Sequence, residues 1–178
     1  MDWTGFWFAV TLLGTPEYWA YFALFSAIAY LALRVLLREN PGWKKAKPVL
    51  KRFLIIFLPS IALFFALTIG LKTLAFVPRP CTPCLDGAAV SGPCNPFCDT
   101  DSSFPSGHSG TIFVVFTSLY LALRKRSSLI LFIIPVLVSF SRIALGVHTP
   151  LDVLGGALLG LIIPILASKF LLNWHKLK

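Results

Sequence analysis

Five long apolar stretches, poor in charged residues, constrain the fold of this chain more than any other feature. A helix needs about 20 residues to cross the hydrocarbon of a bilayer, and fewer where its polar ends are sheltered. The stretches are too long for strands and do not alternate in polarity, so we expect helices. They cover residues 18–37, 53–71, 107–123, 129–145 and 151–172. The predicted fold class is all-α, a polytopic membrane helical bundle of about five transmembrane helices in one domain, 1–178.

The composition agrees with a membrane protein. Hydrophobic residues make up 57% of the chain and charged residues only 13%, a balance outside the usual range of soluble domains. Residues 1–15 are too short to span a bilayer, but they are rich in tryptophan and phenylalanine. This pattern predicts a short N-terminal helix lying at the membrane interface. Thr15 and Pro16 then read as the N-cap and first position of the first span.

Lysine and arginine divide unevenly between the two sides that five spans create. Thirteen of the 16 fall on one side, which the positive-inside rule makes cytoplasmic, together with the C-terminus. The formal net charge of +9 does not indicate a nucleic-acid partner, because the basic residues form no stripe with interleaved aromatics. Three basic residues remain on the outer side and need another explanation: Lys72, Arg79 and Arg142.

The outer loop at residues 80–105 holds every cysteine of the chain: Cys81, Cys84, Cys94 and Cys98. Their spacing would suit a zinc ion bound by four thiolates. An even number of cysteines on an extracytoplasmic loop also fits two disulfides. We favour disulfides because the predicted topology places the loop in an oxidising compartment. The connectivity is left open by the sequence.

The three outer basic residues have ordinary and functional interpretations. Lys72 can be a snorkelling lysine at the end of a span, and Arg79 a loop residue. Arg142 lies inside an apolar stretch, where an arginine costs several kcal/mol unless it meets a polar cavity or an anion. Cations that converge from different spans would form an anion site, and phosphate is the usual ligand.

The third and fifth spans begin with polar segments that can also serve chemistry. Ser106 and Gly107 precede His108 at a helix N-terminus, which is both an ordinary cap and a potential anion site. Thr149 and Asp152 have the spacing of a capping box. Alternatively, Asp152 accepts a hydrogen bond from one ring nitrogen of His148 and leaves the other free as a nucleophile or base. Local sequence does not decide between these roles.

Three motifs follow one another at the outer ends of the predicted spans. They are Lys72 with Arg79-Pro80, Pro105-Ser106-Gly107-His108, and Ser141-Arg142 with His148 and Asp152. In this order they resemble the three-part signature of the type-2 phosphatidic acid phosphatase superfamily, integral-membrane lipid phosphatases related to vanadium haloperoxidases and bacterial acid phosphatases. The resemblance covers residues 72–152 and departs at no signature position. The cysteine-containing loop is not a general feature of that family.

The resemblance implies a two-step phosphoryl transfer that needs no metal and no cofactor. His148 would form a phosphohistidine, Asp152 would orient its ring, and His108 would protonate the leaving oxygen and then activate water. The phosphoryl oxygens would be held by Lys72, Arg79, Ser106, Gly107 and Arg142. Fixed cations and helix N–H groups can supply the charge neutralisation that phosphoryl transfer requires.

The implied substrate is a membrane lipid phosphate, reached from the bilayer on the extracytoplasmic side of the cell membrane. A polyprenyl (undecaprenyl or dolichyl) diphosphate is slightly favoured over phosphatidic acid or phosphatidylglycerophosphate. Two alternatives are a lipid phosphotransferase of the same fold and a transporter whose ion path contains Arg142 and Asp152. The spacing of Gly156 and Gly160 predicts a helix-packing face. The oligomeric state is left open.

Overall fold

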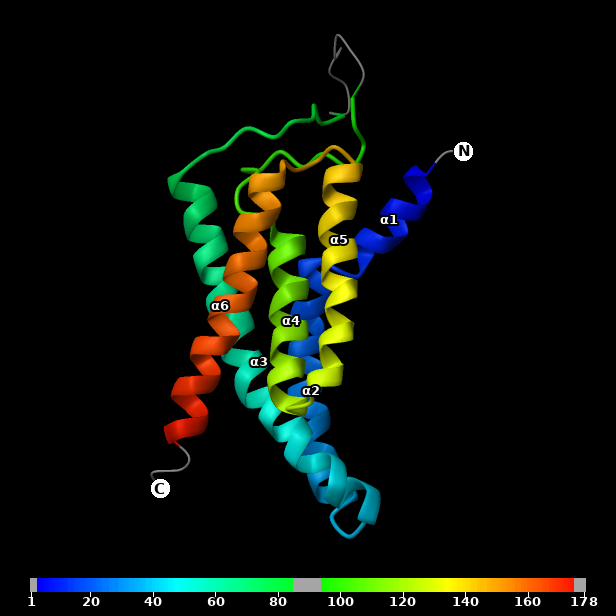
Figure 1. Ribbon diagram of the computed structural model, residues 1–178, viewed down its shortest axis with the longest axis vertical. Helices are drawn as coiled ribbons and strands as arrows, with labels where there is room; N and C mark the ends of the chain where they lie inside the picture. Colours follow the sequence, from blue (N-terminus) through cyan, green and yellow to red (C-terminus); the bar gives the residue numbers. More distant parts are fainter. Residues whose placement is uncertain (1–2, 85–93, 175–178) are drawn as a thin grey trace.

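The computed structural model describes residues 3–84 and 94–174. All the secondary-structure elements in these two ranges are helices. The elements are α1 (Thr4–Leu12), α2 (Pro16–Leu36), α3 (Pro41–Leu74), α4 (Gly107–Leu123), the 3₁₀ helix η1 (Arg126–Phe132), α5 (Ile133–Ala144) and α6 (Pro150–Trp174). Figure 1 shows α2 to α6 as a bundle of long helices, with α1 inclined against it near one end. The all-α fold predicted from the sequence is confirmed.

Four helical stretches are long and apolar enough to cross a membrane. They are Thr4–Leu36, which includes both α1 and α2, Pro41–Leu74, Arg126–Ala144 and Pro150–Leu172. The remaining predicted span, residues 107–123, is α4, which is apolar but only 17 residues long. At 1.5 Å per residue it measures about 26 Å, slightly less than the hydrocarbon thickness of a typical bilayer.

Two helix boundaries differ from the prediction. Helix α3 begins at Pro41, twelve residues before the predicted span at 53, because Asn40 caps it by accepting a hydrogen bond from the Trp43 N–H at 3.1 Å. Several basic residues expected in a connecting loop therefore lie on the first turns of a helix. The predicted fourth span is divided into η1 and α5. Pro16 occupies the first turn of α2, as predicted.

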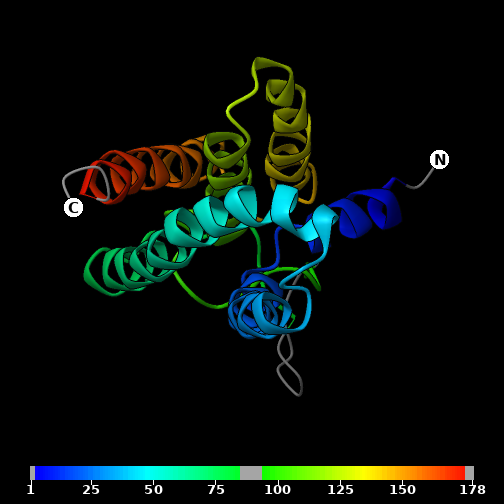
Figure 2. The ribbon, with the colours of Figure 1, turned by 90° about the horizontal axis from the view of Figure 1, so that it is seen from below.

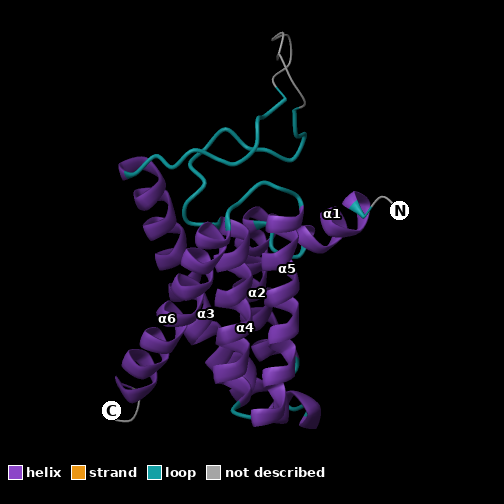
Figure 3. Ribbon diagram, turned by 45° about the horizontal axis from the view of Figure 1, so that its top comes forward, coloured by secondary structure: helices purple, strands orange, loops and turns teal. Residues whose placement is uncertain are grey.

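The two ends of the bundle have different characters. We call the end where α3 stops and α4 and α6 begin the loop end, and the opposite end the basic end. Figure 3 shows the loops crossing the loop end, which is also the upper end of Figure 1. The basic end carries the connections after α2 and α4, with the exposed residues Arg34, Arg38, Lys44, Lys45, Arg124, Lys125 and Arg126. The predicted grouping of these basic residues at one end is confirmed.

Helix α4 is the centre of the bundle and packs against α3, α5 and α6. Gly156 and Gly160 let α6 approach it closely, since a Cβ at these positions would stand 2.3 Å from the Ser106 carbonyl oxygen and 2.5 Å from that of Gly110. The predicted helix-packing face is confirmed. By contrast, α2 buries only Ala23 and stands at one edge of the bundle in Figure 2.

Candidate active site

The loop end contains a cavity of about 440 Å³ in which most of the predicted site residues meet. Lys72, Arg79, Gly107, His108 and His148 line it, together with residues of the first turn of α2 and of segment 99–101. Arg142 and His108 line an adjoining cavity of about 220 Å³. Ser106 and Asp152 are buried. The structure thus brings together residues that lie up to 80 positions apart in the chain.

Backbone hydrogen bonds hold the three motifs in register. The Ser103 N–H donates to the Val77 carbonyl at 2.8 Å, which ties the segment before Arg79 to the segment before α4. The Ser106 N–H donates to the Asp152 carbonyl at 2.9 Å, which fixes the start of α4 against the first turn of α6. Each motif therefore has a rigid attachment to its neighbour.

Asp152 performs the capping role predicted for it. Its Oδ2 accepts a hydrogen bond from the Thr149 N–H at 2.7 Å, and the Asp152 N–H donates to Thr149 Oγ1 at 3.3 Å. This reciprocal pair is the capping box expected at the N-terminus of α6.

The direct hydrogen bond predicted between His148 and Asp152 is not formed. His148 Nδ1 lies 3.7 Å from Asp152 Oδ2, which is beyond hydrogen-bond distance. Ser103 bridges them instead, with its Oγ 3.2 Å from His148 Nδ1 and 2.6 Å from Asp152 Oδ2. The side chain of Ser103 is fully buried. Sequence reasoning missed this residue, because two adjacent serines before a helix look like ordinary capping residues.

The partners of His148 determine which ring nitrogen carries the proton. Arg79 Nη1 lies 3.3 Å from His148 Nε2, and a guanidinium can only donate, so Nε2 must be the unprotonated nitrogen. Nδ1 then carries the hydrogen and donates to Ser103, whose hydroxyl donates to Asp152. The lone pair of Nε2 then accepts from Arg79 Nη1, and both residues line the cavity.

Electrostatics keep His148 neutral. Burial, followed by the nearby positive charges of Arg79 and Arg142, lowers the pKa of His148 to about 3. A neutral imidazole whose Nε2 carries no proton has the protonation state that a nucleophile needs at pH 7.

Arg142 extends from the last turn of α5 into the interior, where its side chain is only 4% exposed. Its Nη1 donates to Thr11 Oγ1 on α1 at 3.1 Å. Its Nε has no partner among the described residues, and neither does the buried Oγ of Ser106. Unsatisfied polar atoms are rare in protein interiors, so these two donors indicate room for an acceptor. Thr11 was not singled out by the sequence, although it lies within the predicted interfacial segment.

Two aspartates that the sequence did not single out also face the cavity. Asp101 pairs with Lys72 and Arg79, and Asp99 lies 3.1 Å from Arg79 Nη2 and 3.9 Å from Arg142 Nη2. Burial alone would raise the pKa of Asp101, but hydrogen bonds and positive charge from Lys72 and Arg79 outweigh it and lower that pKa. The carboxyl groups of both aspartates therefore lie among the three cations.

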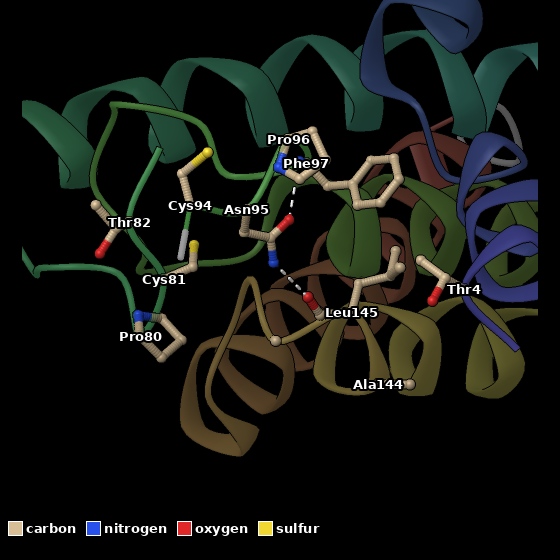
Figure 4. Close-up of a pocket in the computed structure, with 11 residues that line it drawn as sticks. Thr4, Pro80, Cys81, Thr82, Cys94, Asn95, Pro96, Phe97, Ala144 and Leu145 are labelled. Carbon is tan, nitrogen blue, oxygen red and sulfur yellow. Dashed lines mark hydrogen bonds between the residues drawn. The ribbon is translucent and has the colours of Figure 1, made fainter. Parts of the chain in front are cut away.

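The four cysteines form two disulfides, Cys81–Cys98 and Cys84–Cys94. The disulfide prediction is confirmed, and the pairing uses all the thiolates that the zinc alternative would require. Figure 4 shows the segment around them, where Asn95 donates to the Leu145 carbonyl at 2.8 Å and so ties the loop to the end of α5. The cavity drawn there has a volume of about 560 Å³, and none of the described residues in its lining has an ionisable side chain.

Within the described ranges, no three histidine, cysteine, aspartate or glutamate residues are grouped as a metal site would require. The candidate site is instead a set of buried and partly buried cations beside two histidines. Such a site can neutralise a doubly or triply charged anion and hold it beside a nucleophile.

Comparisons with known proteins identify similar sequences and a similar fold. A model of the PAP2 superfamily matches residues 53–176. The undecaprenyl-diphosphatase of Sulfolobus acidocaldarius is 46% identical over 61 residues, which cover 34% of this chain and 30% of that protein. The protein YbjG of Escherichia coli is 44% identical over 63 residues, which cover 35% of this chain and 31% of that protein. These matches span about a third of each relative.

Two solved structures share the fold over most of their length. Aquifex aeolicus LpxE superimposes with a TM-score of 0.62 at 28% identity, covering 93% of this chain and 85% of that one. A PAP2-type phosphatidylglycerolphosphate phosphatase from Bacillus subtilis gives a TM-score of 0.65 at 25% identity, covering 100% of this chain and 80% of that one.

Proposed function

The chain belongs to the PAP2 superfamily, and on that basis we propose that it is a membrane phosphatase that removes phosphate from a lipid. The observation that carries the proposal is the meeting of two histidines and three cations, of which Arg142 is buried, around one cavity system in which no described residue satisfies Arg142 Nε or Ser106 Oγ. A phosphoryl group would satisfy both donors. The whole chain forms the proposed catalytic domain.

In the proposed first step, His148 Nε2 attacks phosphorus and a P–N bond forms while the bond to the leaving oxygen breaks. Ser103 and Asp152 hold the ring and stabilise the proton on Nδ1. His108, which lines the same cavity, donates a proton to the leaving oxygen.

In the second step, His108 removes a proton from water, whose oxygen attacks phosphorus and breaks the P–N bond. Inorganic phosphate is released and His148 returns to its neutral form. Lys72, Arg79 and Arg142 neutralise the charge on the phosphoryl oxygens throughout, while Ser106 Oγ and the Gly107 N–H donate hydrogen bonds to them. No metal or cofactor takes part in these steps.

We favour an undecaprenyl-type diphosphate as the substrate because the Sulfolobus relative carries that activity in its name. A phosphatidylglycerophosphate is the next candidate, from the name of the Bacillus subtilis structure. An apolar cavity of about 660 Å³ between α2, α3 and α4 would receive part of a lipid tail. Its wall includes Trp19, one helical turn from Pro16, which lines the phosphate cavity.

We propose a multi-pass protein of the cell membrane with the basic end in the cytoplasm. This follows from the positive-inside rule and the exposed lysines and arginines at that end. The active site then faces the extracytoplasmic side, where disulfides persist. The C-terminal end of α6 lies at the cytoplasmic side.

The proposal is tested by phosphate release from the protein purified in detergent with excess chelator. The substrates are undecaprenyl diphosphate, phosphatidic acid and phosphatidylglycerophosphate, and His148→Ala serves as the inactive variant. We expect release from at least one substrate, undiminished by chelator and abolished by His148→Ala. Absence of release from all three, or activity that survives His148→Ala, would refute the mechanism. Transfer of phosphate to a lipid acceptor instead of water would favour the phosphotransferase.

A further inference from the structure

All three guanidinium nitrogens of Arg79 already have partners within the chain. Nε donates to the Asp101 carbonyl at 3.2 Å, and Nη1 lies 3.2 Å from the Val147 carbonyl and 3.3 Å from His148 Nε2. Nη2 pairs with the carboxylates of Asp99 and Asp101. A phosphoryl group can therefore bind Nη2 only when the carboxylates release it.

The same two carboxylates contact the other cations of the site. Asp101 pairs with Lys72, and Asp99 lies 3.9 Å from Arg142 Nη2. A carboxylate presents two anionic oxygens to a guanidinium much as a phosphate does. Asp99 and Asp101 thus occupy positions that the oxygens of a bound phosphate would take.

A covalent link holds this acidic segment beside Arg79. The disulfide partners are Cys81, two residues after Arg79, and Cys98, immediately before Asp99, with their Cα atoms 6.0 Å apart. The second disulfide, Cys84–Cys94, lies farther along the loop from both residues. The first disulfide therefore limits how far the carboxylate of Asp99 can move from the cations.

We propose that Asp99 and Asp101 form a carboxylate latch on the phosphate site, so that ligand binding is an exchange of carboxylates for phosphate oxygens. The latch rests on the proposed function, because it uses the same three cations. The free energy needed to displace the carboxylates is the same for any ligand in the site. The electrostatic free energy gained when the ligand meets the cations is smaller for a singly charged phosphodiester than for a phosphomonoester or diphosphate. The latch therefore excludes the phosphodiester lipids that fill membranes.

The first experiment measures the Kd of inorganic phosphate at pH 7 by calorimetry on the full chain in detergent. The variants are Asp99→Asn, Asp101→Asn and the double substitution, which keep the shape of the side chains and remove their charge. We expect the double variant to bind phosphate about tenfold more tightly, because the four contacts between these half-exposed carboxylates and the cations no longer compete with the ligand. Weaker or unchanged binding would overturn the latch and make the aspartates mere supports for the cations.

Glu17→Gln is the matched control. Glu17 lines the same cavity, and among the described residues no ion pair joins it to a cation. The substitution removes the same charge without breaking a contact. A gain in phosphate affinity equal to that of Asp99→Asn would mean that general charge, and not an exchange of partners, sets the affinity.

The second experiment tests the disulfide. Replacing Cys81 and Cys98 with serine should tighten phosphate binding in the wild-type background but not in the Asp99→Asn, Asp101→Asn background. Replacing Cys84 and Cys94 with serine is the control and should have the smaller effect. If replacing either disulfide changes phosphate affinity equally, the Cys81–Cys98 link has no special role in the latch. Loss of phosphate binding after replacement of Cys81 and Cys98 would contradict the proposal.

The third experiment tests selectivity with vesicles of phosphatidylglycerol, a phosphodiester, as a competitor of phosphate. We expect competition in the double aspartate variant and little in the wild type; equal competition in both would refute the exclusion. These measurements need no turnover. If the aspartate variants bind phosphate more tightly but the protein hydrolyses no lipid, the latch is supported and the proposed function is rejected. If the protein hydrolyses a lipid phosphate but the variants bind phosphate no more tightly, the proposed function is supported and the latch is rejected.

Discussion

The two ends of the bundle use basic residues in opposite ways. At the loop end, the side chains of Arg79 and Arg142 are 5% and 4% exposed and lie among acids, hydroxyls and a histidine. At the basic end, the side chains of Arg38 and Lys44 are 85% and 59% exposed, and both pair with Glu39 in solvent. Charge of the same sign is thus buried at one end and exposed at the other, and we propose that the first serves the site and the second the topology.

The physical reason is the cost of burying charge. An arginine removed from water needs anionic or polar partners, whereas an exposed one is stable without them. Despite this cost, Arg142 Nε has no partner in the part of the chain that the structure describes. A residue held in an unfavourable state in the free protein is a strong candidate for ligand binding.

The largest expected effect compares one arginine from each end. Arg142→Ala should lower kcat/KM for the lipid phosphate about 100- to 1,000-fold, because it removes a fixed cation from the charged transition state. Arg126→Ala, at the exposed basic end, should change it less than about twofold. Steady-state kinetics check both predictions, and thermal unfolding shows whether the two variants are as stable as the wild type. Similar losses in the two variants would erase the functional distinction between the ends.

Ser103→Ala should give the next largest effect, a fall in kcat of about tenfold with little change in KM. The variant removes the hydroxyl between His148 and Asp152, so the nucleophile loses its orientation while phosphate binding is kept. Ser103→Thr, which retains the hydroxyl, should recover part of the activity. A change confined to thermal stability would show that Ser103 has only a structural role.

The loop end should also make stability sensitive to acid. His148 has a pKa lowered to about 3 in the folded protein, so between that value and about 6.5 the unfolded chain binds more protons. The lowered pKa of Asp101 acts in the same direction at lower pH, because an aspartate of the unfolded chain takes up its proton only at about pH 4 and below. Stability should therefore fall as the pH drops from 6.5 toward 4.

Thermal unfolding in detergent across this pH range measures the effect. His148→Asn should flatten the dependence, because the titrating group is gone. An unchanged slope would mean that His148 does not contribute to it.

The smallest effect is expected from the ion pairs of the basic end. Glu39→Gln breaks the contacts with Arg38 and Lys44 but should change the free energy of unfolding by less than about 0.5 kcal/mol, since exposed pairs are weak and screened by salt. Chemical denaturation at low and high salt checks this. A loss above about 1 kcal/mol would show that the basic end also contributes to the fold.

Much of the site was predictable because its residues stand in short motifs. Lys72, Arg79, His108, Arg142 and His148 were all singled out, and the structure brings them to two adjoining cavities. The capping box of Asp152 was also predictable, since it depends on residues three apart. Their chemical roles stay predictions until the kinetic tests are made.

The missed residues share a physical feature. Ser103 meets Asp152 across 49 positions, and Thr11 meets Arg142 across 131. Asp99 and Asp101 lie in a polar loop where acidic residues are commonplace. Nothing in the local sequence marks these contacts, because they arise where separate helices dock.

The sequence by itself determined the helical bundle, the grouping of basic residues at one end and the order of the motifs. These follow from apolar length against bilayer thickness and from charge position, which are properties of continuous segments. Only the tertiary structure decided the disulfide pairing, the serine between His148 and Asp152, and the carboxylates on the cations. Those features depend on ångström-scale distances between side chains on different elements, which helix docking sets and local patterns do not encode.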